Sequence, residues 1–378
     1  MTGFTLTVDL SKKIPFAHQT SLFYLRRTLK KEISGIQQMG IGIPNVHEAW
    51  KWYRENFSMD VPVFEEAATA DLMLPYTGGK PHDRHAILAL NLQGGGGFEI
   101  WQYTSRTPEA ASFITKLGDY GINICKIKSP DVKRAFQNFD KTFLISKEVE
   151  KTPNGLKHFF VKDPYGNIFQ VIESDEWFSD RKDDTGGVYG AIIGVSDIEK
   201  SKDFYSKILG YDTVILEDEG KFTDLQLLEG GKSRFKRAIL SHSKARKGGF
   251  SPLLGKTQIE LVQNLDEKGQ NIYENRYWGD LGFIHLCFDV VGMNALKEEC
   301  EAYGKPFTVD SANSFDMGEA AGHFSYIEDP DGTLIEFVET HKIPIMKKIG
   351  WYLDLRKRDP LKPLPRWMLK SLGLSRKK

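Results

Sequence analysis

Two stretches of the sequence share one pattern, DPYGNIFQVIE (residues 163–173) and DPDGTLIEFVE (residues 329–339). Each is predicted to be a turn followed by a strand, because proline presets φ and the glycine two residues later adopts a conformation that other residues resist. A strand-like run precedes each turn, at residues 158–161 and 323–327. The two stretches therefore indicate two copies of one strand–turn–strand unit.

A second pattern, a short apolar strand followed by a helix start, occurs further upstream. The strand at residues 40–43 leads to Asn45, and Asn45 with Glu48 three residues on is typical of a helix N-cap with a reciprocal carboxylate. Similar openings are expected at Ile122 and at Phe283.

The strand at residues 191–195 leads in the same way to Ser196 and Asp197. Glu199, three residues after the serine, completes a similar capping box. Asp131 is the expected cap after the strand that starts near residue 122.

Together these patterns divide the chain into four repeats, each read as strand, helix and three strands. The predicted segments are an N-terminal basic arm (1–35), the four modules (36–105, 119–176, 186–266 and 281–342) and a basic, aromatic C-terminal tail (343–378).

This order, with the Asp-Pro-x-Gly turn before the last strand of modules two and four, resembles the vicinal-oxygen-chelate superfamily of glyoxalases, bleomycin-resistance proteins and ring-cleaving dioxygenases. The resemblance covers about three quarters of the chain. It implies an α+β fold in which four βαβββ modules pair into two barrel-like clefts, because one curled sheet cannot bury its apolar face alone. A generic α+β repeat is the alternative.

The resemblance also implies two cleft-facing positions in each module. One lies seven residues before the helix opening, and the other lies in the middle of the last strand. In chain order these positions hold Gln38 and Glu99, Asn123 and Gln170, Gly190 and Glu260, and His285 and Glu336. Pro130 is expected to lengthen the turn in module two, which leaves the position of Asn123 uncertain by one residue.

Physical chemistry supports some of these positions independently. Glu336 shares one strand face with Leu334 and Val338, and a carboxylate buried between apolar neighbours is costly unless it is paired or bound to metal. Glu99 and Glu260 raise the same question. The alternative is that each glutamate faces solvent or meets a lysine or arginine.

Module pairing decides which of these side chains meet. In the glyoxalase I pattern, modules one and four pair, which places Gln38, Glu99, His285 and Glu336 around one centre. The second cleft then retains one strong ligand, Glu260. Pairing of modules three and four would instead resemble ring-cleaving dioxygenases and hydroxyphenylpyruvate dioxygenase, whose Fe(II) site needs a histidine where this chain has Gly190.

Three oxygen donors and one imidazole suit a divalent ion: Zn, Ni, Co, Mn or Fe. By resemblance, the substrate is a small molecule with vicinal oxygens. The reaction is proton transfer next to a carbonyl through a metal-stabilised enediolate or enolate, as in a glyoxalase-type lyase, isomerase or epimerase. Glu336 would act as the base and Glu99 would return the proton. An Fe(II) dioxygenase and a metal-free binding or resistance protein remain alternatives.

Composition excludes some other classes. The formal net charge is zero, so no global electrostatic bias toward nucleic acid is expected. Three scattered cysteines and the lack of a long apolar run or a secretory signal predict a cytoplasmic protein. The C-terminal tail allows three interpretations: packing across the repeats, weak contact with an anionic membrane surface, or a lid over the cleft.

Overall fold

The computed structural model describes residues 30–312, 315–316, 321–346 and 351–377. Most of the predicted N-terminal arm (1–35) therefore lies outside the described residues, and only its last residues are seen, where the first strand begins at Glu32.

Four repeats of strand, helix and three strands follow one another along the chain. The first contains β1 (Glu32–Gly42), α2 (Val46–Phe57), β2 (Val61–Thr69), β3 (Asp83–Leu90) and β4 (Gly97–Tyr103). The second contains β5 (Gly121–Ser129), α3 (Val132–Asn138), β6 (Glu150–Lys151), β7 (Lys157–Lys162) and β8 (Ile168–Glu173).

The third and fourth repeats each carry one additional short element. The third contains β9 (Val188–Gly194), α4 (Ile198–Leu209), β10 (Thr213–Gly220), β11 (Phe235–Ser241), α5 (Ser251–Leu254) and β12 (Gln258–Asn264). The fourth contains β13 (Gly282–Val291), α6 (Met293–Ala302), β14 (Val309–Asp310), β15 (Phe315–Asp316), β16 (Ala321–Glu328) and β17 (Leu334–Thr340).

The helix starts follow the predicted caps with one correction. Asn45 and Asp131 cap α2 and α3, and each side chain accepts a hydrogen bond from a backbone N–H of the first turn. For α4 the predicted box led by Ser196 is wrong. Asp197 is the cap, because its carboxylate accepts the N–H groups of Glu199 and Lys200.

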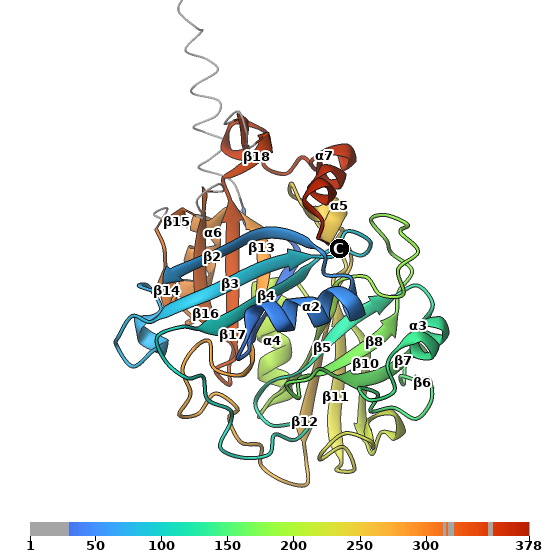
Figure 1. Cartoon of the computed structure of the whole chain (residues 1–378). Helices are drawn as coiled ribbons and strands as arrows, with labels where there is room; N and C mark the ends of the chain where they lie inside the picture. Colours follow the sequence, from blue (N-terminus) through green and yellow to red (C-terminus); the bar gives the residue numbers. More distant parts are fainter. Residues whose placement is uncertain (1–29, 313–314, 317–320, 347–350, 378) are drawn as a thin grey trace, which may run out of the picture.

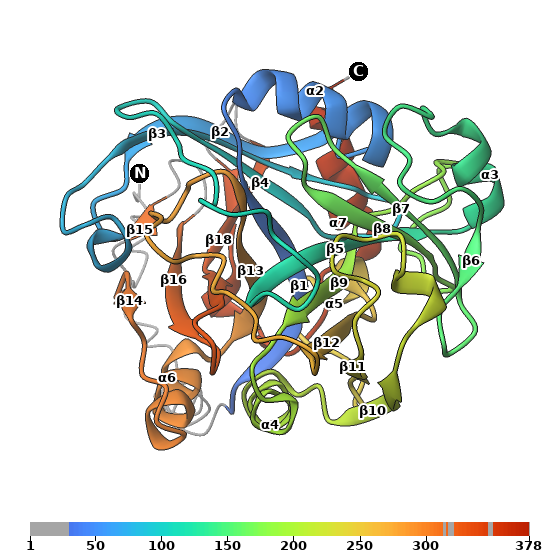
Figure 2. The same cartoon turned by 90° about the horizontal axis from the view of Figure 1, so that it is seen from below.

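The strands form two large sheets, each built from two modules. The first has the order β14-β16-β17-β13-β1-β4-β3-β2, with β15 beside β16, and the second has the order β10-β11-β12-β9-β5-β8-β7-β6. The modules are joined where β1 pairs antiparallel with β13 and where β5 pairs antiparallel with β9. Modules one and four therefore share one sheet, and modules two and three share the other (Figures 1 and 2). The predicted α+β fold with two paired barrel-like clefts is confirmed, and the pairing of modules three and four does not occur.

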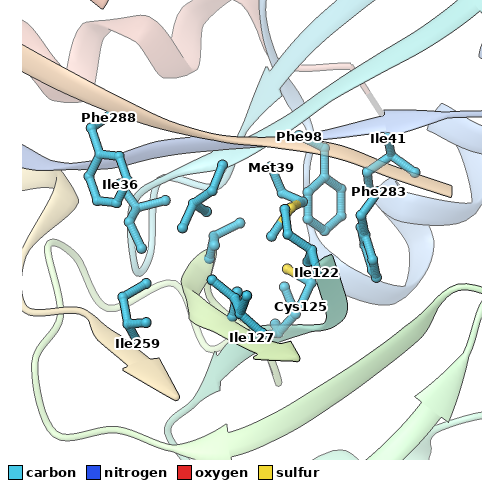
Figure 3. Packing of buried hydrophobic residues seen from close by; sticks show 14 of the residues in the cluster. Ile36, Met39, Ile41, Phe98, Ile122, Cys125, Ile127, Ile259, Phe283 and Phe288 are labelled. Carbon is cyan, nitrogen blue, oxygen red and sulfur yellow. The ribbon is translucent and has the colours of Figure 1, made fainter. Parts of the chain in front are cut away.

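The main apolar core lies where the two sheets pack back to back. Side chains of the first sheet such as Ile36 and Met39 meet side chains of the second such as Ile122 and Ile127 (Figure 3). Each sheet therefore buries one face in this shared core, and its other face is left to line a cleft.

The repeated Asp-Pro-x-Gly turns also connect neighbouring modules. The hydroxyl of Tyr53 on α2 donates to Asp163 at 2.6 Å, and that of Tyr205 on α4 donates to Asp329 at 3.1 Å. Each aspartate lies in the turn of the following module, so the motif that reveals the repeat also joins modules one to two and three to four.

The tail after residue 340 packs onto the end of the first cleft. It contains the hairpin of β18 (Lys342–Met346) and β19 (Trp351–Asp354), followed by α7 (Arg366–Ser371). Leu364 and Leu369 are buried in a cluster with Leu88 and Leu90 of β3. Among the described helices, none has both the length and the apolar character needed to cross a membrane.

Candidate metal centre

The four side chains predicted to meet in the first cleft do meet. The imidazole Nε2 of His285 lies 3.1 Å from a carboxylate oxygen of Glu336 and 3.3 Å from one of Glu99. The amide nitrogen of Gln38 lies 3.3 Å from those same two oxygens. The four residues come from β1, β4, β13 and β17. Gln38 and Glu336 are 298 residues apart in the sequence, and the pairing of modules one and four brings them together.

Strand register explains why these positions converge. In module one, Glu99 pairs with Gly40, two residues after Gln38 on the same strand face. In module four, Glu336 pairs with Cys287, again two residues after His285. Each module thus presents one side chain from its first strand and one from its last strand to the same face of the sheet.

His285 is held by its surroundings on every side. The ring of Trp278 stacks nearly parallel to the imidazole at 6.3 Å, and the Tyr326 hydroxyl lies 3.5 Å from Nδ1. When Nδ1 carries the proton, it donates to that hydroxyl and the Nε2 lone pair faces the two carboxylates. Gly40 lies directly beneath the ring: a Cβ there would be 2.5 Å from the imidazole Cε1.

The described side chains of this cluster carry more negative than positive charge. Burial lowers the pKa of His285, but Glu336 and Glu99 outweigh that effect and raise it to about 9. Burial raises the pKa of the Glu336 carboxyl, and His285 holds it below its usual value. Even with the imidazole protonated, two carboxylates face a single cation in a site that water reaches poorly.

The residues fit a divalent cation. Glu99, His285 and Glu336 each offer a ligand atom, and these atoms lie within 4.8 Å of one another. The Oε1 atom of Gln38 is buried and has no hydrogen-bond partner, so a flip of the amide would turn a free oxygen toward the same centre. Burying an unpartnered oxygen and an excess of negative charge is costly, and a bound cation would remove both costs.

The corresponding position in the second sheet is neutralised by the chain itself. Glu260 on β12 is fully buried, with Lys126 at 2.5 Å and Arg237 at 2.6 Å from its two oxygens. Arg237 also binds Asp224 at 2.9 Å. Burial alone would raise the pKa of Glu260, but Arg237 and Lys126 lower it to about 2. The alternative interpretation of a buried glutamate, that it meets a lysine or arginine, therefore holds for Glu260.

The other residues expected in the second cleft do not form a site. Asn123 is wrong as the first-strand residue of module two, because Gln170 pairs with Lys126 and the equivalent position two residues earlier is Ile124. The Asn123 amide instead binds backbone groups of residues 118–121. Pro130 does not lengthen the turn, so the unmodified spacing of seven residues before Asp131 holds.

Gln170 and Gly190 do not contribute to a metal site either. The Gln170 amide lies 3.1 Å from Nδ1 of His158 in the sheet interior. A Cβ on Gly190 would be 1.7 Å from the carbonyl oxygen of Gln258 on the neighbouring strand, so no side chain fits there with the strands as they are.

Sequence reasoning missed the residues that surround both centres. Lys126, Arg237 and Asp224 occupy the second cleft. The position of Lys126 within the apolar run of residues 124–127 could have signalled a buried lysine that needs a carboxylate. Trp278 lies in the connection before module four, and no pattern in the sequence links it to His285.

A cavity of about 290 Å³ lies over the first cluster. Gln38, Glu99 and Glu336 line its floor, and the walls come from β2, β3, β4, β16, β17 and the segment 70–73. The cluster therefore adjoins a space large enough for a small molecule.

Comparison with known proteins adds two kinds of finding. Residues 189–337 match the family model of the Glyoxalase/Bleomycin resistance protein/Dioxygenase superfamily. A lactoylglutathione lyase from Pseudomonas putida is 27% identical over 152 residues, which are 39% of this chain and 82% of the relative. A lactoylglutathione lyase from Pseudomonas aeruginosa is 29% identical over 151 residues, which are 39% of this chain and 79% of the relative.

Among solved structures, a proposed dioxygenase from Bacillus subtilis superimposes with a TM-score of 0.53 at 14% identity. The superposition covers 82% of this chain and 86% of that chain. At this identity the likeness concerns the fold alone.

Proposed function

Since the chain belongs, through residues 189–337, to the glyoxalase, bleomycin-resistance and dioxygenase superfamily, we propose that it is a metal-dependent enzyme of the glyoxalase type. It would transfer a proton next to a carbonyl of a small substrate with vicinal oxygens, as a lyase, isomerase or epimerase. Gln38, Glu99, His285 and Glu336 would hold a divalent ion: Zn, Ni, Co, Mn or Fe.

One observation carries the proposal. In the second sheet the two buried carboxylates of Glu260 and Asp224 are matched by two cations, Lys126 and Arg237. In the first sheet the carboxylates of Glu99 and Glu336 share, among the described residues, only the imidazole of His285. The two sheets are built by the same repeat, so the missing positive charge in the first is best supplied from outside the chain.

The chain's own residues account for the chemistry that such a site needs. A bound divalent ion would act as a Lewis acid on neighbouring substrate oxygens and make the adjacent C–H group more acidic. Glu336 would accept that proton and Glu99 would return one. Both carboxylates line the cavity, which supports these roles. Tyr326 and Trp278 orient His285, and the apolar cavity walls limit access of water to the reacting carbon.

The dioxygenase alternative that depended on pairing modules three and four is not supported. Glu260 would have to replace the histidine that is missing at Gly190, but it lies in a different sheet from Glu336 and pairs with Lys126 and Arg237. A metal-free binding protein remains the competing function, and it requires the carboxylates of the first cleft to be structural.

The test is the metal content of the chain purified without a metal-binding tag, measured by elemental mass spectrometry. About one divalent ion per chain is expected, and His285→Ala and Glu336→Ala should lose it, because each removes a buried ligand. No metal after reconstitution would refute the enzyme proposal.

A cluster of ligand-type side chains on the surface provides a control variant for this experiment. His47, Glu65 and His85 also form a group of three ligand-type side chains on the outer wall of module one. His85→Ala should therefore leave the metal of the cleft in place, and any ion that this variant does lose belongs to the surface cluster.

A further inference from the structure

The charges that line the first cleft are almost all negative. Among the described residues, four carboxylates line the cavity, those of Glu66, Asp71, Glu99 and Glu336, against one guanidinium, that of Arg84. One divalent ion bound by Glu99 and Glu336 would balance those two carboxylates and leave the outer two in place.

The one cation that the structure describes in the lining, Arg84, is already paired with a carboxylate. Arg84 binds the carboxylate of Glu66 at 2.5 Å and the backbone carbonyl of Glu66 at 3.2 Å. Its side chain is only 13% exposed, so the pair is largely shielded from water. Among the described residues of the lining, no unpaired cation is left to bind an anionic substrate.

A neighbouring cavity of about 540 Å³ contains a further cation, but its terminal nitrogens are already taken by backbone carbonyls. It shares Trp278 with the cleft and contains Arg276. The terminal nitrogens of Arg276 donate to the backbone carbonyls of Ile272 and Leu281. Its guanidinium therefore serves to hold the loop before β13.

Much of the remaining wall is apolar and aromatic, beside the polar side chains of Gln37 and Thr69. Phe64, Leu88, Trp101, Trp278 and Val338 face the cavity beside the charged floor. Such walls favour an apolar body, because they gain by removing hydrocarbon surface from water.

On these grounds we infer that the substrate is an uncharged, largely apolar molecule with vicinal oxygens, and not an anionic conjugate. The inference rests on the proposed function for the vicinal oxygens, but the preference for a neutral body follows from the walls and charges alone. A carboxylate on the substrate body would meet the carboxylate of Asp71 and the neutral Glu66–Arg84 pair, with no free cation among the described lining residues to compensate it.

The test compares two chelating probes of nearly the same shape, phenylacetohydroxamic acid and its 4-carboxy derivative. Calorimetry or thermal shift is run with both on the full chain, with and without bound metal. The neutral probe should bind at least about 100-fold more tightly than the carboxylated one in both states. S-hexylglutathione, an anionic conjugate, should not compete with the neutral probe.

Two variants test the cause of the preference. Glu66→Gln frees Arg84, so the carboxylated probe should gain at least about tenfold in affinity while the neutral probe stays unchanged. In Glu66→Gln/Arg84→Met this gain should disappear.

The outcomes separate the two proposals. Equal affinity for both probes, or competition by S-hexylglutathione, would overturn the inference of a neutral substrate. Affinities that keep the neutral preference but do not depend on metal would support the inference and count against the proposed metal-dependent function.

Discussion

At the scale of single residues, Gly40 is required by the position of His285. A Cβ at this position would lie 2.5 Å from one ring carbon and 2.7 Å from both ring nitrogens of His285. Gly40→Ala should therefore displace the imidazole, weaken metal binding by about 10- to 100-fold and lower stability by about 1–3 kcal/mol. Chelator competition and thermal unfolding measure these two effects.

Two further variants serve as controls for the Gly40→Ala substitution. Gly220→Ala, at a glycine with no atom near the added Cβ, should change neither quantity. In a His285→Ala background the stability cost of Gly40→Ala should vanish, because the ring it strikes is gone. A cost that persists in that background would place the clash elsewhere.

Residue identities in the first site could be predicted because repeat spacing and strand alternation both point to them. Gln38, Glu99, His285 and Glu336 occupy equivalent positions of two modules, and periodicity carries that information along the chain. Asn123 was misplaced by one residue, and a shift of one residue moves a side chain to the opposite face of a strand. Whether a buried glutamate meets metal or a lysine depends on contacts between strands, which spacing alone does not encode.

At the scale of elements, the stability of the protein should respond very differently to the same substitution in the two sheets. Glu260→Gln leaves Lys126 and Arg237 buried beside a neutral side chain and should destabilise the protein by about 3–5 kcal/mol. Glu336→Gln removes one of two carboxylates that share a single imidazole, so metal-free protein should change by less than about 1 kcal/mol. Thermal unfolding of both variants in the presence of a chelator gives the comparison. A large loss of stability in Glu336→Gln would contradict the excess of negative charge in the first cluster.

The cost of Glu260→Gln should depend on pH. The folded pKa of Glu260 is about 2, below the value of about 4.3 in an unfolded chain. Its charge therefore stabilises the fold fully above about pH 4.3, and this contribution is lost as the pH falls toward 2. The difference in melting temperature between the parent chain and Glu260→Gln should shrink over that range. A difference that stays constant would mean that the carboxylate is not the source of the stability.

At the scale of the whole molecule, the four-module architecture was predictable but the pairing was open in the sequence. Taken alone, each module would leave the edge of its first strand unpaired. These four strands, β1, β5, β9 and β13, are all rich in apolar residues. Either pairing would bury such edges, so the pattern of apolar residues does not distinguish them. Resemblance to glyoxalase I favoured the pairing of one with four and two with three, and the sheets confirm it.

The C-terminal tail raises the last prediction at this scale. Its inward side chains, Leu364 and Leu369, are buried against the repeats, whereas Trp367 is 66% and Leu374 90% exposed. Lys370 is exposed between these two apolar side chains. Apolar side chains beside basic ones suit weak binding to an anionic membrane surface, which we propose for this face.

Flotation with vesicles of phosphatidylglycerol and phosphatidylcholine tests this contact on the full chain. Trp367→Ser/Leu374→Ser should lower the vesicle-bound fraction at least about tenfold, because two side chains lose their burial in the lipid interface. High salt should lower it as well, since the basic side chains contribute through screened charge. Ile114→Ser, at an apolar side chain that is 77% exposed on another part of the surface, should float like the parent chain. Equal flotation of parent and double variant would refute the membrane contact and leave packing against β3, through Leu364 and Leu369, as the role of the tail.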